Sequence, residues 1–267
     1  MSKLKNLEEI KQFWDSASKS ALDHRKLRPV APDEQLQRLI ESRIKPYLKP
    51  TWKCLDIGCG DGLSTIKFAP LVKKITAIDY IEGFVERAKK NAAKNSITNI
   101  EFQNGNILKL PALTEKNKYD CLITIRCLIN LGSWENQKKA LSNIAKVVKR
   151  GGYAIISEGW HEGVMGVKDY WLNHNLGEFN IPTFNCLIKK SQFEKAIAKD
   201  FEIIDYHGFG FYMFMSRIFQ PIFVSPEKPH HNHLINKKAE QMLMENKSLE
   251  KAFPECDYTG LYVLRKK

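Results

Sequence analysis

Three glycines alternate with other residues in the stretch CLDIGCGDG, residues 54–62, and an aspartate stands two residues before the first of them. A glycine-rich turn after a strand can hold a dinucleotide, a nucleoside triphosphate or S-adenosylmethionine. A dinucleotide turn needs G-x-G-x-x-G, but the third position required is Leu63. A phosphate loop needs G-x-x-x-x-G-K followed by Ser or Thr, and no lysine follows here. The spacing therefore matches neither phosphate-binding pattern.

The stretch instead resembles the first motif of class I S-adenosylmethionine-dependent methyltransferases, in which an apolar strand runs into Asp, an aliphatic residue and Gly-Cys-Gly-x-Gly. The resemblance implies that Gly58, Cys59 and Gly60 approach the methionine part of the cofactor, since glycine places no Cβ in the way. It also implies that Asp56, near the strand end, accepts a hydrogen bond from the cofactor's ammonium group, directly or through water.

Later residues follow the order of the same family. Asp79 ends the next predicted strand, 23 residues after Asp56, close to the spacing at which an acid accepts both ribose hydroxyls. The resemblance implies that Tyr80 flanks the adenine. Asn106 stands where relatives carry an acid, and its amide oxygen is implied to accept from the adenine amino group. Ile107 is implied to pack on the adenine ring.

The residues after the fourth and fifth predicted strands should contact the methyl acceptor, because ligands of open α/β sheets lie outside the carboxyl ends of the strands. The stretch TIRCLINLGSW (124–134) has neither the Asp-Pro-Pro-Tyr type of motif of nucleic-acid amino-methyltransferases nor the Pro-Cys of cytosine C5 enzymes. The paired acids of arginine methyltransferases and the magnesium carboxylates of catechol-type enzymes are missing at matching positions. These differences favour a small polar acceptor.

A hydroxyl acceptor benefits from a general base. His161 is the first candidate, with Glu158 beside it in SEGWHEG (157–163), and His207 at the end of the sixth predicted strand is the second. The alternative for the first pair is that Glu158 caps a backbone turn and His161 is a loop residue. An anionic phosphate or phosphoramidate oxygen would need no base.

Arg126 and Asn130 are predicted to hold an anionic or hydroxylated substrate, Arg126 by bidentate contact with phosphate or carboxylate. Arg126 is also counted among the cofactor-binding residues, and the alternative for both is packing under the adenine pocket. Trp160, Tyr212 and Arg217 are predicted to line the acceptor site. The aromatic-rich GFGFYMFM around Tyr212 is equally typical of a core or a subunit contact.

The stretch PHHNH (229–233) holds three histidines within five residues and raises the question of a metal. No cysteine or carboxylate clearly completes a ligand set, so we favour a surface loop and predict no metal. The six cysteines form no CxxC pair and no regular framework, which fits a reducing compartment.

The patterns RCLINLGSWENQ, ISEG, SQFE, GFGFYMFMSRI and SPEKP are similar to methyltransferases encoded among bacterial surface-polysaccharide genes. This resemblance implies an acceptor that is an activated sugar, a nucleotide-linked capsule precursor or a related phosphorus-containing group. Those relatives carry Trp-His-Asn where this chain has Thr183, Phe184 and Asn185.

Predicted strands alternate with predicted helices, which indicates βαβ units and a Rossmann-like α/β fold with helices on both faces of the sheet. We expect seven strands, mostly parallel, with an antiparallel last edge strand, in one domain over residues 1–267. An N-terminal helical cap (7–49) and an insertion before the last strand (208–256) lie outside this pattern. Both are plausible lids, and the insertion is also a candidate dimer contact. The predicted strands are 52–58, 75–80, 99–105, 119–128, 153–159, 201–208 and 258–266, and the predicted helices are 63–74, 82–95, 133–152 and 190–200.

The net charge of +12 invites a nucleic-acid hypothesis, but the lysines are interleaved with acids along the chain. The sequence shows no signal-peptide pattern and no apolar run long enough for a membrane span, so we expect a cytoplasmic protein. Our interpretation is an S-adenosylmethionine-dependent methyltransferase of a small anionic or sugar substrate, favouring transfer to oxygen. The alternatives are N- or C-methylation of another metabolite, a non-catalytic cofactor-binding subunit and, last, RNA methylation.

Overall fold

The computed structural model describes residues 5–20 and 31–267. A seven-stranded sheet forms its centre, with the strand order β3-β2-β1-β4-β5-β7-β6. All neighbouring pairs from β3 to β5 are parallel, and β7 is antiparallel to both β5 and β6. The strands are β1 (Lys53–Ile57), β2 (Lys74–Asp79), β3 (Ile100–Asn104), β4 (Tyr119–Ile125), β5 (Val148–Gly159), β6 (Phe201–Gly208) and β7 (Thr259–Lys266).

The predicted Rossmann-like fold is confirmed, including the antiparallel orientation of the last strand. One detail differs, because β7 lies between β5 and β6, and β6 forms the outer edge. The residue pattern agrees with this order. β7 is buried along most of its length, whereas four successive residues in the middle of β6 are exposed.

Two apolar layers cover the sheet because successive side chains of a strand point to opposite faces. Cys54 faces the layer that includes α2, α3, α9 and α11, while Leu55 faces the layer that includes α6 and α8. The helices are α1 (Leu7–Ser20), α2 (Glu34–Ile44), α3 (Leu63–Phe68), α4 (Glu82–Lys94), α5 (Leu110–Leu113), α6 (Trp134–Val147), α7 (His161–Asn173), α8 (Lys190–Ile197), α9 (Gly210–Phe214), a π-helix (Met215–Phe219), α10 (Gln220–Val224) and α11 (Leu234–Glu245).

Local sequence explains where the helices begin. Asn6 accepts hydrogen bonds from the amides of Glu8 and Glu9, and the Glu9 side chain accepts from the Asn6 amide, which is a capping box at the start of α1. Asp33 caps α2 through the Leu36 amide. Ser133 caps α6, its hydroxyl accepting from the Asn136 amide.

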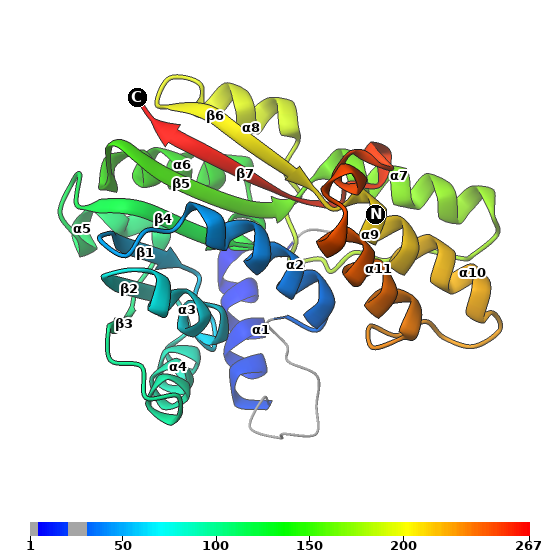
Figure 1. Ribbon diagram of the computed structural model, residues 1–267, viewed down its shortest axis with the longest axis horizontal. Helices are drawn as coiled ribbons and strands as arrows, with labels where there is room; N and C mark the ends of the chain where they lie inside the picture. The colour runs from blue at the N-terminus through cyan, green and yellow to red at the C-terminus, as the bar shows by residue number, and fades with distance from the viewer. Residues whose placement is uncertain (1–4, 21–30) are drawn as a thin grey trace.

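Additional helices gather beyond the carboxyl ends of the parallel strands. Figure 1 shows β5 pointing toward α7, α9, α10 and α11, while β7 runs the opposite way. The insertion at 208–256 is therefore a helical layer that packs against α2 and α7. None of the described helices is long and apolar enough to cross a bilayer.

The helix predicted at 133–152 is shorter than expected. It ends at Val147, because Val148 begins β5 and pairs with Tyr119 of β4. Gly151 and Gly152 consequently lie inside β5 instead of at the end of the predicted helix, and Gly151 has a φ of +74°.

Candidate active site

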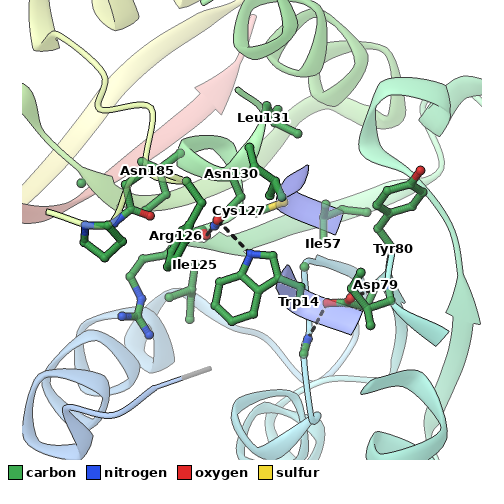
Figure 2. A pocket seen from close by; sticks show the side chains of 18 of the residues that line it. Trp14, Ile57, Asp79, Tyr80, Ile125, Arg126, Cys127, Asn130, Leu131 and Asn185 are labelled. Atoms are coloured by element: carbon green, nitrogen blue, oxygen red, sulfur yellow. Dashed lines mark hydrogen bonds between the residues drawn. The ribbon is translucent and has the colours of Figure 1, made fainter. Parts of the chain in front are cut away.

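A cavity of about 480 Å³ opens at the carboxyl ends of β1, β2 and β4. The turns after these strands line it, and α1 and the loop at 179–185 supply further walls. Figure 2 shows side chains from these separate parts of the chain directed into one space. Of the predicted site residues, the cavity brings together Gly58, Gly60, Asp79, Tyr80, Asn106, Ile107, Arg126, Asn130 and Arg217.

The glycine turn brings the backbone close to the chain that follows β4. Gly58 has a φ of +76°, and a Cβ there would lie 2.9 Å from the Cβ of Cys127. Gly60 has a φ of +55°, and its amide donates to Asp79 Oδ2 at 2.8 Å. Both glycines of this turn adopt the left-handed backbone region, where glycine carries no steric penalty. A bulkier residue at Gly58 would narrow the cavity floor.

Asp79 ends β2 with its carboxylate buried at the cavity wall. Oδ1 accepts from the Ile81 amide at 2.9 Å and Oδ2 accepts from Gly60. Burial raises the pKa of Asp79 to about 6. A carboxylate has about four acceptor positions, so two remain for hydroxyl donors. This donor and acceptor balance fits a ribose.

Apolar residues lie next to this carboxylate and suit a planar ring. Ile57, Ile78, Ile107 and Leu108 line the same cavity, and Tyr80 is 45% exposed beside them. Together with the glycine turn and Asp79, these residues fit S-adenosylmethionine, which would place its ribose at Asp79 and its adenine among the aliphatic side chains. Asn106 Oδ1 already accepts from the Leu108 amide at 2.8 Å, which leaves one lone pair for the adenine amino group.

Asp56 and Cys59 are buried beside the cavity but are not part of its lining. Asp56 Oδ2 accepts from the Thr65 hydroxyl at 2.6 Å, and burial raises the pKa of Asp56 to about 6. Of the two predicted routes from Asp56 to the cofactor's ammonium group, this placement favours the one through water.

The turn after β4 carries two polar residues of the cavity lining, Arg126 and Asn130. Arg126 has a φ of +52°, which non-glycine residues rarely adopt. Asn130 ends the following 3₁₀ turn (Leu128–Asn130), and its Nδ2 donates to the Arg126 carbonyl at 2.8 Å. Its Oδ1 accepts from Nε1 of Trp14 at 3.0 Å (Figure 2). Trp14 of α1 therefore contacts Asn130 of the turn after β4 inside the cavity.

Glu158 has a different position from the one predicted for a base. Its side chain is fully buried, and its two oxygens accept from the amides of Cys127, Leu128 and Ile129 at 2.9, 2.7 and 3.3 Å. Burial raises the pKa of Glu158 to about 8. The capping alternative therefore describes Glu158, and we correct its assignment as a base.

His161 and Trp160 do not line the cavity. His161 begins α7, and its amide donates to the Ile188 carbonyl at 2.9 Å. Trp160 is fully buried and packs edge-on against Phe193 and Tyr262. The predicted substrate contact of Trp160 is corrected to a core position, and the geometry gives His161 no support as a base.

His207, the second candidate base, also lies away from the cavity. Its Nδ1 is 2.8 Å from Glu250 Oε2, and its Nε2 is 3.0 Å from the Tyr47 hydroxyl. Both ring nitrogens therefore have partners within the protein. This position corrects the assignment of His207 as well.

A buried carboxylate, Asp33, joins two predicted substrate residues. Tyr212 donates to Asp33 Oδ1 at 2.6 Å, and Arg217 donates to Asp33 Oδ2 at 2.5 Å. Asp33 and Arg217 line the cavity, whereas Tyr212 stands behind them. The sequence-based prediction missed Asp33 and Trp14. The pattern Pro-Asp-Glu before a helix signals a cap at Asp33, but no local signal shows that either residue reaches the cavity.

The described residues contain no group of three or more His, Cys, Asp or Glu side chains arranged to hold a metal ion.

Comparison with known proteins identifies the family. Residues 48–212 match a family model described as a methyltransferase domain. Because this match covers more than half of the 267 residues, the chain belongs to that methyltransferase family. The predicted enzyme class is confirmed, and so is S-adenosylmethionine as the methyl donor.

Curated relatives agree on the methyltransferase class. The ubiquinone biosynthesis O-methyltransferase of Rickettsia akari (strain Hartford) is 30% identical over 148 residues, which is 54% of each chain. The uncharacterized methyltransferase YcgJ of Bacillus subtilis (strain 168) is 27% identical over 139 residues, 52% of each chain. The chain thus spans about half the length of these relatives.

Solved structures share the fold at low identity. The [4+2]-cyclase SpnF has a TM-score of 0.62 at 19% identity and covers 100% of this chain and 99% of its own. The N-methyltransferase NodS from Bradyrhizobium japonicum WM9, solved with S-adenosyl-L-homocysteine, has a TM-score of 0.55 at 14% identity, covering 98% and 99%. Because a cyclase is among these neighbours, the fold alone does not fix the reaction.

Proposed function

We propose that this protein transfers the methyl group of S-adenosylmethionine to an oxygen of a small polar acceptor. The acceptor class we favour is an activated sugar or a nucleotide-linked phosphoramidate precursor of a surface polysaccharide. One observation carries this proposal. One cavity is lined both by Asp79, the carboxylate expected to bind the ribose, and by a separate set of polar residues that includes Arg126, Asn130 and Arg217.

The walls of the cavity favour a small acceptor over a polymer. Helix α1 lies over the site, with Trp14 bonded to Asn130 and packed edge-on against Phe184. Phe13 of the same helix stacks on Phe184 with ring centroids 4.3 Å apart. A cavity walled by these side chains suits an acceptor that is small enough to enter it.

The charges at the cavity favour an acceptor that carries negative charge. Lys11, Arg126 and Arg217 line it, and Arg217 is balanced by Asp33. Asp79 also lines the cavity, so the three basic residues of the lining exceed its two acids, Asp33 and Asp79, by one. A guanidinium can bind phosphate through two parallel hydrogen bonds, which suits a nucleotide-linked acceptor.

Catalysis of this transfer rests mainly on positioning. The bound cofactor supplies a methyl group already activated by its sulfonium. The chain's residues hold the acceptor oxygen in line with that methyl group, and holding two reactants in register removes much of the entropic barrier. Asn130 and Asn185 line the cavity with amide groups that can orient acceptor hydroxyls. Trp14 and Phe184 limit the access of water.

Transfer to nitrogen or carbon of another small metabolite is the alternative. The names of similar proteins include an O-methyltransferase and an N-methyltransferase. The amide and guanidinium groups at the acceptor side bind oxygen and nitrogen acceptors alike, so a product analysis must distinguish them.

The test is a methyl-transfer assay read by mass spectrometry. S-adenosylmethionine is offered with nucleotide-activated sugars, a nucleotide-linked phosphoramidate and bulk RNA, and Asp79→Ala serves as the cofactor-deficient control. The proposal expects one added methyl group on a nucleotide-linked small molecule, with fragmentation placing it on oxygen. Methylated RNA, or methylation of nitrogen or carbon, would contradict it. The same holds if tight cofactor binding is accompanied by no product from the whole panel.

A further inference from the structure

The three histidines of PHHNH occupy three different environments. His233 caps α11, its Nδ1 accepting from the Ile235 amide at 3.2 Å. His230 packs edge-on against His233, with ring centroids 5.3 Å apart. His231 lines the cavity of the proposed active site, and its side chain is 33% exposed. No other histidine within residues 5–20 and 31–267 lines this cavity.

Buried amides hold the His231 segment in place. Nδ2 of Asn236, a fully buried residue of α11, donates to the His231 carbonyl at 3.0 Å. Nε2 of Gln220, also buried, donates to the His230 carbonyl at 3.0 Å. The backbone that carries the imidazole is thus anchored to two helices of the insertion.

The imidazole faces a carboxylate that is already organised. His231 Nδ1 lies 3.6 Å from Asp33 Oδ2. Burial alone would raise the pKa of Asp33, but the ion pair with Arg217, the nearby imidazole of His231 and the hydrogen bonds from Tyr212 and the Leu36 amide hold that pKa well below its usual range. Asp33 is consequently an anion at neutral pH.

A buried anion at Nδ1 selects the imidazole tautomer. It favours the proton on Nδ1 and leaves the lone pair on Nε2, and it stabilises the imidazolium that forms when Nε2 takes a proton. The distance of 3.6 Å is long for a hydrogen bond, and such contacts often shorten when a substrate binds.

We propose that His231, oriented by Asp33, is the general base for methyl transfer to a hydroxyl. This inference rests on the proposed function, since it needs a hydroxyl acceptor. The acceptor oxygen forms a bond to the methyl carbon while that carbon's bond to sulfur breaks, with the electron pair remaining on sulfur. The hydroxyl proton moves to Nε2 of His231, whose Nδ1 faces the carboxylate of Asp33. Asp33 is a positioning residue in this scheme.

The groups that face His231 set its pH response. Asp33 precedes α2, Tyr212 belongs to α9 and Arg217 to the π-helix. The other charged residues lining the cavity are Lys11, Asp79 and Arg126. Because Nε2 must be unprotonated, kcat should fall toward low pH as the imidazolium forms.

The first test requires no acceptor. Protein labelled with ¹⁵N-histidine and saturated with S-adenosyl-L-homocysteine should show neutral His231 with its proton on Nδ1. Asp33→Asn should lose this preference, while asparagine still caps α2. A proton on Nε2 in the parent, or the same tautomer mixture in parent and Asp33→Asn, would overturn the inference.

The second test uses the hydroxyl acceptor identified in the panel. His231→Asn should lower kcat by about 10²–10⁴-fold, leave S-adenosyl-L-homocysteine affinity unchanged, abolish the low-pH fall of kcat and regain activity with added imidazole. His230→Asn is the matched control and should turn over at the parent rate. If His231→Asn keeps the parent rate while methyl transfer proceeds, as for an anionic phosphorus acceptor, the inference fails and the proposed function stands. If no acceptor of the panel is methylated, the proposed function is wrong. The tautomer measurement then still tests whether Asp33 orients His231.

Discussion

Asp79 joins the glycine turn to the expected ribose position through one carboxylate. Asp79→Ala removes the acceptor for the Gly60 amide as well as the contacts to the ribose. Hydrogen bonds to a charged group contribute about 1.5–3 kcal/mol each, so the affinity for S-adenosyl-L-homocysteine should fall by about a hundredfold or more. Isothermal titration calorimetry measures this loss.

The matched control for that substitution is Glu86→Ala, which removes an exposed acid from α4. It should bind S-adenosyl-L-homocysteine as the parent does. If both variants bind equally well, Asp79 does not hold the cofactor.

Glu158 gives the stability of the protein a defined pH dependence. Its pKa is raised from 4.5 to about 8 by burial, so the folded protein holds this proton more tightly than the unfolded chain. The free energy of unfolding should therefore fall as the pH rises from about 4.5 to about 8 and level off above that. Asp56 and Asp79 act in the same direction, but only up to about pH 6.

Glu158→Gln should remove the part of this dependence that lies between pH 6 and 8. Urea unfolding at a series of pH values measures it. Glu202→Gln, at an exposed position of β6, is the control and should keep the parent slope. An unchanged slope in Glu158→Gln would show that Glu158 is not the group responsible.

At the scale of elements, α1 closes the cavity through its contact with the turn after β4. Trp14→Ala removes the hydrogen bond to Asn130 and the aromatic contacts with Phe84 and Phe184. Aromatic pairs contribute about 0.5–1.5 kcal/mol each, so S-adenosyl-L-homocysteine should dissociate about tenfold faster. Stopped-flow displacement measures the rate, and Gln12→Ala on the exposed side of α1 should match the parent. Equal rates in Trp14→Ala would show that α1 is not a cap on the cofactor.

Element boundaries show how tertiary pairing overrides local signals. Gly151 and Gly152 are typical of a helix end. The strand nevertheless begins at Val148, because that residue pairs with Tyr119 of β4. The last strand follows the same principle. Its residue pattern indicates a strand, but only the sheet decides that β7 enters between β5 and β6.

The charge of the whole molecule is spread over many elements. Exposed lysines pair with acids on separate parts of the surface, as in Lys74 with Glu101 and Lys89 with Glu86. A net charge of +12 distributed in this way should give weak RNA binding without a defined site. We expect no methylated RNA and only weak filter binding that disappears at moderate salt. Saturable, tight binding with a steep dependence on salt would support the RNA alternative.

The sequence by itself determined the residues that we propose for the cofactor half of the site. The glycine turn and Asp79 are local features. A tight turn and an acid at a strand end are each specified by a few consecutive residues, so their motif can be found in the sequence. These residues, with Tyr80, Asn106 and Ile107, could be named from their motif and its spacing. The order of strands and helices followed from the alternation of apolar and polar segments.

The sequence predicted Arg126, Asn130 and Arg217 for the proposed acceptor half, and only the tertiary structure added Trp14, Asp33 and His231 to it. Trp14, Asp33, Asn130, Arg217 and His231 come from distant parts of the chain and meet because α1, α2 and the insertion fold over one sheet edge. Glu158 and His161 looked catalytic because they stand at the carboxyl end of β5. The structure instead buries Glu158 against three backbone amides, and His161 begins α7 away from the cavity. Spacing along the chain carries no information on which distant side chains share a cavity, since packing of the whole fold determines that.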